Sequence, residues 1–225
     1  VTTLAGGQLS LLSLGGTTKD RVSPITQAGQ CLAAMDDGVL VGTKSSILLY
    51  SLGTGKTIKQ RGTFNVTGCT DISVAGDGSK AMGLSPCDTN TDGMADSDCL
   101  TELKIGTNLK EGKAAVLDKK ASATHIRLSM DGKTAVVADG GGIYGLVLDS
   151  SGGNTHTITS VSWTFAAKPV ALARSPRKEK ISGRLVDLFA VAESSKKLIR
   201  FVGIDVDRAK WVELGPSRLE ISLSE

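Results

Sequence analysis

The 225-residue chain is long enough to bury the core of one large all-β domain or two small ones without help from metals or crosslinks. Its 26 Lys and Arg residues nearly balance 23 Asp and Glu residues, for a net charge of +3. This balance argues against nucleic acid or an anionic membrane as the principal partner. Because no apolar run approaches the roughly 20 residues of a membrane helix, the sequence predicts no membrane span.

The N-terminal third predicts a series of short strands. LAGGQLSLLSL at 4–14 and RVSPITQ at 21–27 have the composition of strands at the outer side of a sheet. CLAAMDDGVLVGT at 31–43 has two apolar runs on either side of Asp37-Gly38, the pattern of an antiparallel hairpin. SILLYSL at 46–52 predicts a third strand after this hairpin.

The hairpin and its third strand recur further along the chain. TDISVAGDGSKAMGLS at 70–85 and THIRLSMDGKTAVVAD at 124–139 superpose without a gap at an offset of 54 (124 − 70), and PVALARSPRKEKISGRLVDLFAVAE at 169–193 repeats the pair with a longer turn. The predicted third strands are LTELKIG at 100–106, GIYGLVLD at 142–149 and KLIRFVGID at 197–205, and less regular fourth strands follow in TITSVSWTF and KWVELG.

Four antiparallel strands that recur roughly every 40–54 residues, with no helical periodicity between them, are typical of a β-propeller blade. The chain resembles the WD40-like and related propeller families over nearly its whole length, although the Trp-Asp and Gly-His signatures are absent. The resemblance implies an all-β fold, a single β-propeller domain over 1–225 with about five four-stranded antiparallel blades.

The two ends of the chain look complementary. The N-terminal strands lack an innermost strand before them, and RLEISLS at 218–224 is a strand without a blade. We therefore expect Leu219 to Leu223 to pair beside the Thr3 to Leu14 region and to close a five-bladed ring, which removes two open sheet edges. The alternative is a piece of a six- to eight-bladed propeller.

The segment CDTNTDGMADSDC at 87–99 falls where the next repeat has only DGGG at 139–142, so 86–99 is an inserted acidic loop. Calcium takes six to eight oxygen ligands, which a loop supplies from alternate positions with Gly at the sixth. The segment resembles thrombospondin type 3 and EF-hand-like calcium loops, which implies Ca²⁺ as a cofactor. The implied ligands are Asp88, Asn90, Asp92, the Met94 carbonyl, Asp96 and Asp98, with Gly93 at the sixth position.

This loop departs from both calcium-loop families at its end. Position twelve is Cys99, so the terminal carboxylate must come from Asp98 or Glu102. A solvated polar loop is the alternative, since Asp, Asn, Gly and Thr are also common turn residues.

The four cysteines form an even count without zinc-site spacing. We expect a Cys87–Cys99 disulfide that restrains the inserted loop, and hence a secreted or extracytoplasmic protein, with a cytoplasmic location as the alternative. Cys31 and Cys69 belong to successive inner strands and are close enough to bond in principle. For them we expect buried thiols.

Two sets of residues are candidates for partner binding. Asp71, His125 and Lys168 precede the first apolar residue of successive inner strands, so with Asp139, Glu193 and the acidic loop they predict a polar mouth at one end of the channel. On the opposite face the basic hairpin RSPRKEKISGR presents Arg174, Arg177 and Lys178, which suit an acidic or phosphorylated partner. A solvated loop is the alternative.

These features favour a non-enzymatic interaction module that binds a protein or glycan partner through its loops. The alternative is a secreted, calcium-dependent, glycosidase-like hydrolase in which Asp71 and His125 perform acid and base chemistry at the channel mouth. Convergence of both residues with a further Asp or Glu would favour the hydrolase.

Overall fold

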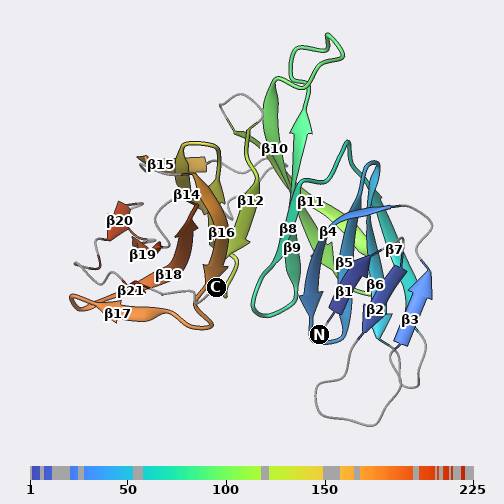
Figure 1. Cartoon of the computed structure of the whole chain (residues 1–225), viewed down its shortest axis with the longest axis horizontal. Helices are drawn as coiled ribbons and strands as arrows, with labels where there is room; N and C mark the ends of the chain where they lie inside the picture. The colour runs from blue at the N-terminus through green and yellow to red at the C-terminus, as the bar shows by residue number, and fades with distance from the viewer. Residues whose placement is uncertain are drawn as a thin grey trace.

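The computed structural model describes residues 2–5, 8–11, 21–24, 28–52, 58–117, 122–148, 158–164, 168–194, 198–205, 207, 210–212, 214 and 219–220. In these ranges the regular elements are all β-strands, which form five antiparallel sheets (Figure 1). A helix with the length and hydrophobicity to cross a bilayer does not occur within them.

Sheet 1 contains β1 (Thr2–Ala5), β2 (Gln8–Leu11) and β3 (Arg21–Pro24). Sheet 2 contains β4 (Gly29–Met35), β5 (Gly38–Thr43), β6 (Ser46–Leu52) and β7 (Ile58–Asn65). Sheet 3 contains β8 (Asp71–Val74), β9 (Lys80–Cys87), β10 (Ser97–Ile105) and β11 (Leu109–Leu117).

Sheet 4 contains β12 (His125–Leu128), β13 (Thr134–Ala138), β14 (Gly142–Leu148) and β15 (Ile158–Thr164). Sheet 5 contains β16 (Pro169–Arg174), β17 (Glu179–Ile181), β18 (Arg184–Glu193), β19 (Leu198–Asp205), β20 (Lys210–Val212) and β21 (Leu219–Glu220). β16 and β17 pair with the same edge of β18, and β20 and β21 pair with the same edge of β19. Sheet 5 is therefore also four strands wide.

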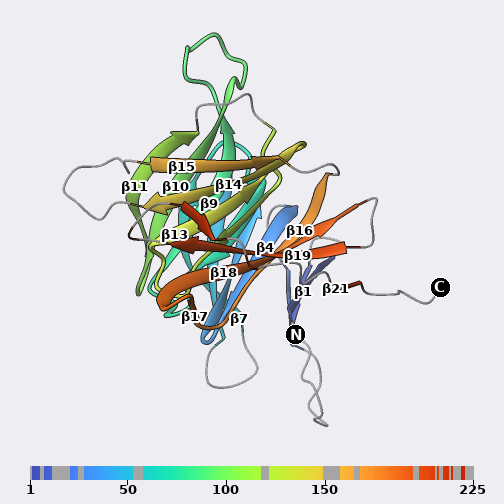
Figure 2. The same cartoon turned by 90° about the vertical axis from the view of Figure 1, so that its left-hand side faces the viewer.

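The sheets follow one another in sequence order, as blades do in a propeller. The strands β4, β8, β12 and β16 lie side by side as the innermost strands, and the sheets fan outward from them (Figures 1 and 2). The predicted architecture of sequential four-stranded antiparallel sheets is confirmed for sheets 2 to 4.

Alternating residues of one strand fill the cores on both sides of a sheet. In β13, Ala135 and Val137 pack toward sheet 3, whereas Val136 and Ala138 pack toward sheet 5. All four side chains are fully buried. Because successive side chains of a strand point to opposite faces, an uninterrupted apolar strand is what a sheet covered on both faces requires.

The Asp-Gly pairs turn the chain at the ends of the inner hairpins, with one difference from expectation. Gly78 and Gly132 adopt positive φ values of 69° and 63° inside the five-residue connections 75–79 and 129–133. Between β4 and β5, however, the turn residues are Asp36 and Asp37, and Gly38 already pairs with Met35 in the sheet. A Cβ at Gly38 would lie 2.5 Å from the Tyr50 carbonyl oxygen, so close strand packing requires glycine there.

The predicted closure of the ring by the C-terminal strand is wrong. β21 pairs with β19 through Leu198↔Glu220 and Ile199↔Leu219, inside sheet 5 rather than beside β1. β20 pairs with β19 only at Gly203–Asp205. The first residues of β19 therefore have an edge on which β21 can pair. Residues 221–223 of the predicted strand lie outside the described residues.

Candidate functional site

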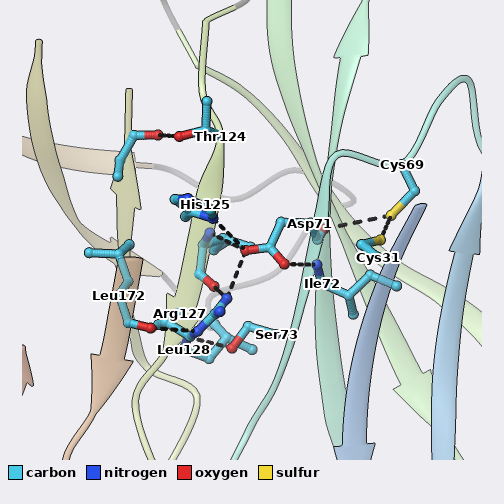
Figure 3. Close-up of polar contacts among 12 residues, drawn as sticks. Cys31, Cys69, Asp71, Ile72, Ser73, Thr124, His125, Arg127, Leu128 and Leu172 are labelled. Carbon is cyan, nitrogen blue, oxygen red and sulfur yellow. Dashed lines mark hydrogen bonds and ion pairs between the residues drawn. The ribbon is translucent and has the colours of Figure 1, made fainter. Parts of the chain in front are cut away.

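Polar side chains connect the innermost strands of sheets 3 and 4. No backbone ladder joins β8 to β12, but Asp71 Oδ2 accepts a hydrogen bond from Ile126 N at 2.9 Å and Ser73 Oγ accepts one from Leu128 N at 2.8 Å (Figure 3). The two acceptor side chains are two residues apart, as are the two donor amides, so the acceptors share one face of β8 and the donors share one edge of β12. These bonds satisfy N–H groups at a strand edge that lacks a neighbour.

Asp71 is the centre of this network. Its Oδ1 accepts from Ile72 N at 2.9 Å, and its Oδ2 lies 2.7 Å from Arg127 Nη1 and 3.8 Å from His125 Nδ1 (Figure 3). The predicted proximity of Asp71 and His125 is therefore present. With Asp71 buried and accepting from two backbone amides and a guanidinium, its contacts are those of a structural carboxylate that links two blades.

Among the described residues, the contacts of Asp71 do not include the further Asp or Glu side chain that would favour a hydrolase. In the part of the chain that the structure describes, the contacts of the Asp71 carboxylate are with Ile72 N, Ile126 N, Arg127 and His125, and none of these is a second carboxylate. Acid and base chemistry needs groups within hydrogen-bond reach of a substrate, and the bonds of Asp71 are directed at the protein itself.

The other residues of the predicted polar mouth have local roles. Asp139 Oδ1 accepts from Gly141 N and Gly142 N at 2.7 Å, and its Oδ2 accepts from the Tyr144 hydroxyl at 2.5 Å. Glu193 is buried and pairs with Arg200. Lys168 is exposed, and its carbonyl accepts from Ser194 N at 3.0 Å. Of the predicted mouth residues, only Asp71 and His125 are joined to each other by the contacts of the described residues.

Arg174 lies at the other end of the innermost strands and points inward. It lines a channel cavity of about 330 Å³ together with Arg127 and residues of β4 and β8. Its guanidinium donates to the Val74 carbonyl and to the Leu128 carbonyl, the latter at 3.4 Å. Burial and the nearby charge of Arg127 lower the pKa of Arg174 below its usual value. Arg174 therefore joins sheets 3, 4 and 5 rather than extending from the basic hairpin.

The remaining candidates of the basic hairpin are also paired. Arg177 is highly exposed and lies 3.0 Å from Glu179. Lys178 lies 3.0 Å from Asp131 and 3.5 Å from Asp187, which is buried. Burial would lower the pKa of Lys178, but its bonds to the two carboxylates raise it. Lys178 consequently ties sheet 5 to the β12–β13 turn, and a role in partner binding stays a prediction.

Replacing Lys178 with Met is expected to lower the free energy of unfolding by about 1–2 kcal/mol at pH 7, because the buried Asp187 charge loses its counter-ion. Burial raises the pKa of Asp187 in the folded protein. Protonated Asp187 therefore favours the folded state at pH values below the ordinary Asp pKa, and this contribution is lost as the pH rises through the raised pKa. Protonation also relieves the unpaired charge, and the deficit of the variant should therefore shrink at pH 4. Urea unfolding at both pH values measures this, with the exposed Arg177→Met as the control.

The inserted loop is a projecting hairpin, and its predicted disulfide is present. β9 and β10 pair as far as Cys87↔Ser97, and their connection extends beyond the other strands in both views (Figures 1 and 2). Cys87 and Cys99 form a disulfide with a Cα–Cα distance of 5.6 Å. The crosslink joins two neighbouring strands of sheet 3 at the base of the loop.

The predicted calcium ligands are arranged around the backbone of the loop. Asp88 accepts from Thr91 N and Gly93 N, both at 2.7 Å. Asn90 and Asp92 each accept from the amide two residues later. Hydrogen bonds from the backbone N–H and hydroxyl of Thr89 hold the pKa of Asp96 below its usual value. The same oxygens that would bind a cation thus hold the loop in a defined turn.

Both residues that could complete the calcium site are engaged elsewhere. Asp98 is buried, and its Oδ2 accepts from Ser122 N at 3.0 Å and Ala123 N at 2.8 Å. Glu102 is buried with its Oε2 3.7 Å from Lys80 Nζ. The Asp98 oxygen that binds these amides supports the entry to sheet 4, so any cation would rely on the ligands at the tip of the loop.

A cavity of about 440 Å³ lies at the base of the hairpin. Its lining combines apolar and polar side chains from sheets 2 and 3 and from the connections that follow β7 and β9, among them Phe64, Val66, Pro86, Asp88 and Glu111. Met94, at the tip of the hairpin, is 70% exposed. The projecting hairpin and the cavity beneath it form a concave surface with an apolar tip, which we call the hairpin surface.

Ser73 and Arg127 were missed by the interpretation of the sequence, although a signal for them exists. At the offset of 54 that aligns Asp71 with His125, Ser73 aligns with Arg127. Polar residues thus occupy alternate positions of both inner strands, which is the pattern of a strand with one face on a polar channel.

Comparison with known proteins establishes the fold and not the function. No protein-family profile and no curated protein matches the chain. Solved structures do: a functionally unknown protein from Desulfotomaculum acetoxidans matches at 12% identity and a TM-score of 0.67 over 88% of this chain and 58% of its own length. A Lactobacillus plantarum protein matches at 12% identity and 0.64 over 95% and 65%, respectively.

A third structure, a proposed 6-phosphogluconolactonase from Bacteroides uniformis, matches at 11% identity and a TM-score of 0.64 over 95% of this chain and 66% of its own length. The chain thus spans 58–66% of the length of these three structures. At 11–12% identity the likeness concerns the fold alone. The protein is an all-β chain with a propeller-like arrangement of four-stranded antiparallel sheets.

Proposed function

We propose that the protein is a non-enzymatic recognition module that binds a protein or glycan partner through the hairpin surface. The observation that carries this proposal is the projecting, disulfide-bonded hairpin with a cavity at its base. Its acidic side chains already bind loop amides and its base is crosslinked, so little conformational entropy remains to be lost when a partner binds.

The chemistry of the hairpin surface suits recognition. Met is enriched in the central contact regions of protein interfaces, and Met94 is the most exposed large apolar side chain of the described residues. In the lining of the cavity, Asp88 and Glu111 supply hydrogen-bond acceptors and Asn65 supplies an amide. By contrast, the carboxylate of Asp71 is occupied by blade-linking bonds, which favours binding over hydrolysis.

The test replaces residues 88–96 with Asn-Gly, a turn that suits a two-residue hairpin closed by the Cys87↔Ser97 pair. Labelled wild-type and shortened proteins are applied to a glycan array. Protein partners that a photo-crosslinker at position 94 of the wild type captures are then tested for binding to both proteins. We expect the shortened protein to melt like the wild type and to lose binding, whereas Arg177→Ala keeps it. Equal binding by the shortened protein would refute the role of the hairpin.

We further propose that the tip of the hairpin binds Ca²⁺ through Asp88, Asn90, Asp92, Asp96 and the Met94 carbonyl. The support is the spacing of these oxygen groups and their position on one short turn. A ligand that binds only the native state stabilises it by about 2.7 kcal/mol at a hundredfold excess over its Kd, or about 5–10 °C in Tm for a chain of this size.

Calcium at such an excess should therefore raise the Tm of the wild type above its value in chelator. The double substitution Asp88→Ala and Asp92→Ala should abolish the rise. The matched control changes Asp36 and Asp37, an exposed acidic pair on the opposite face, and should retain it. Identical melting of the wild type in millimolar calcium and in chelator, with no heat in calorimetry, would show that the loop is only polar.

A further inference from the structure

The two cysteines outside the hairpin lie against each other. Cys31 belongs to β4 of sheet 2 and Cys69 to the connection that enters β8 of sheet 3, and their Sγ atoms are 2.8 Å apart (Figure 3). A covalent S–S bond measures about 2.05 Å. Less than 1 Å of movement therefore separates the two thiols from a disulfide.

The backbone, and not a chance side-chain rotamer, brings the two sulfur atoms together. Cys31 pairs with Gly42 across β4 and β5, while Cys69 N donates to the carbonyl of the next residue, Thr43, at 3.0 Å. A Cβ at Gly42 would overlap both sulfur atoms. Strand β5 thus holds both cysteines at adjacent positions, and its glycine provides the space in which they meet.

Neither a metal site nor a thiol hydrogen bond accounts well for the cysteine pair. A structural metal site requires about four ligands, and among the described residues no group of three His, Cys, Asp or Glu side chains is placed to hold a metal ion. As a hydrogen bond the contact would be poor, because a thiol is a weak donor and a weak acceptor. The chain already contains one disulfide, Cys87–Cys99, so disulfide chemistry is compatible with its remaining cysteines.

We propose that Cys31 and Cys69 form a second disulfide, which crosslinks sheet 2 to the start of sheet 3 when the chain meets a disulfide oxidant such as glutathione disulfide or an oxidised dithiol oxidoreductase. Unlike the Cys87–Cys99 bond, which spans 12 residues of one hairpin, this bond spans 38 residues and joins two blades.

Burial sets the order of the reaction. Cys31 is partly exposed, whereas Cys69 is only 2% exposed. The hydrogen-bond contact with the Cys31 thiol and burial raise the pKa of the Cys69 thiol. The Cys31 thiolate therefore attacks the oxidant RSSR, forms a mixed disulfide and expels one RS⁻. Cys69 then loses its proton and attacks the Cys31 sulfur, which expels the second RS⁻. Two protein thiols are oxidised, and one external disulfide is reduced to two thiols.

The sequence allows the pairing to be determined without ambiguity. Trypsin separates Cys31 in peptide 22–44 and Cys69 in peptide 62–80, and leaves Cys87 with Cys99 in peptide 81–104. The intact chain is equilibrated with glutathione disulfide, its unreacted thiols are alkylated under denaturing conditions, and the non-reduced digest is analysed by mass spectrometry. We expect peptides 22–44 and 62–80 linked to each other, and no alkylated cysteine.

The Cys31→Ser variant should leave Cys69 as an alkylated thiol, whereas the Cys69→Ser variant should stop at the mixed disulfide of Cys31 with glutathione. Neither variant should give a linked peptide, and the Cys87–Cys99 bond should be unchanged in both. The oxidised wild type should melt about 8–15 °C above the Cys31→Ser/Cys69→Ser double variant, because a crosslink of this span restricts the unfolded chain. If two alkylated cysteines per chain persist in peptides 22–44 and 62–80 after oxidation, or if either peptide is linked to 81–104 instead, the proposal is overturned.

Discussion

Replacing Phe189 with Ala is expected to lower the free energy of unfolding by about 3–5 kcal/mol and the Tm by about 6–20 °C. Phe189 on β18 is fully buried between sheets 4 and 5, against Val136, Ile143 and Leu172 among others. Removing the ring loses its burial and leaves a cavity that strands fixed by their ladders cannot fill. Urea or thermal unfolding monitored by circular dichroism measures the effect.

Leu185→Ala on the same strand is the matched control, because Leu185 is 62% exposed and its loss should change stability by less than about 0.5 kcal/mol. Equal effects of the two substitutions would contradict the packing of sheet 5 on sheet 4. That packing places Arg174 in the channel, so the result also bears on the arrangement of the inner strands.

Replacing Asp71 with Ala should lower the free energy of unfolding by about 3 kcal/mol and the Tm by about 6–12 °C. The Ala side chain leaves Ile126 N without its acceptor and removes the carboxylate opposite Arg127. Each buried polar group left unsatisfied costs about 1–3 kcal/mol. Because both partners belong to β12, the loss should loosen the contact between sheets 3 and 4, which hydrogen exchange at Ile126 and Leu128 would report.

Two control variants distinguish the loss of this blade link from the general loss of a carboxylate. Asp77→Ala removes an exposed carboxylate that bonds only its own turn and should cost less than about 1 kcal/mol. Asp71→Asn keeps an acceptor for Ile126 N but not the charge opposite Arg127, so an intermediate loss is expected. Wild-type stability of Asp71→Ala would show that Asp71 is available for a partner, as its sequence position suggested.

The repeated strands could be predicted from the sequence because apolar alternation and turn residues are local features of the chain. Alternating apolar residues and the Asp-Gly turns predicted the inner hairpins, and SILLYSL coincides with β6 over Ser46–Leu52. The insertion was also legible, since a gap-free alignment of two repeats shows the extra residues. The Cys87–Cys99 disulfide was predicted as a restraint on this insertion, and in the structure it joins diagonal neighbours of β9 and β10, since Cys87 lies opposite Ser97 and Cys99 opposite Ser85.

The roles of the charged side chains were not readable, because each depends on a distant partner. Asp98, a predicted calcium ligand, also binds the amides of residues 122 and 123. Lys178, a predicted partner-binding residue, also pairs with Asp131 and Asp187. Residue type and spacing do not reveal such contacts, since the packing of one blade on the next decides which charges are buried together.

The sequence by itself determined the inner hairpins, the third strand that follows each of them and the position of the acidic hairpin, since periodicity and turn residues act within a few residues along the chain. Only the tertiary structure decided that β21 completes sheet 5, that Asp71 links two blades, and that Cys31 meets Cys69. Those contacts depend on which strand edge is vacant and which side chains share the space between sheets.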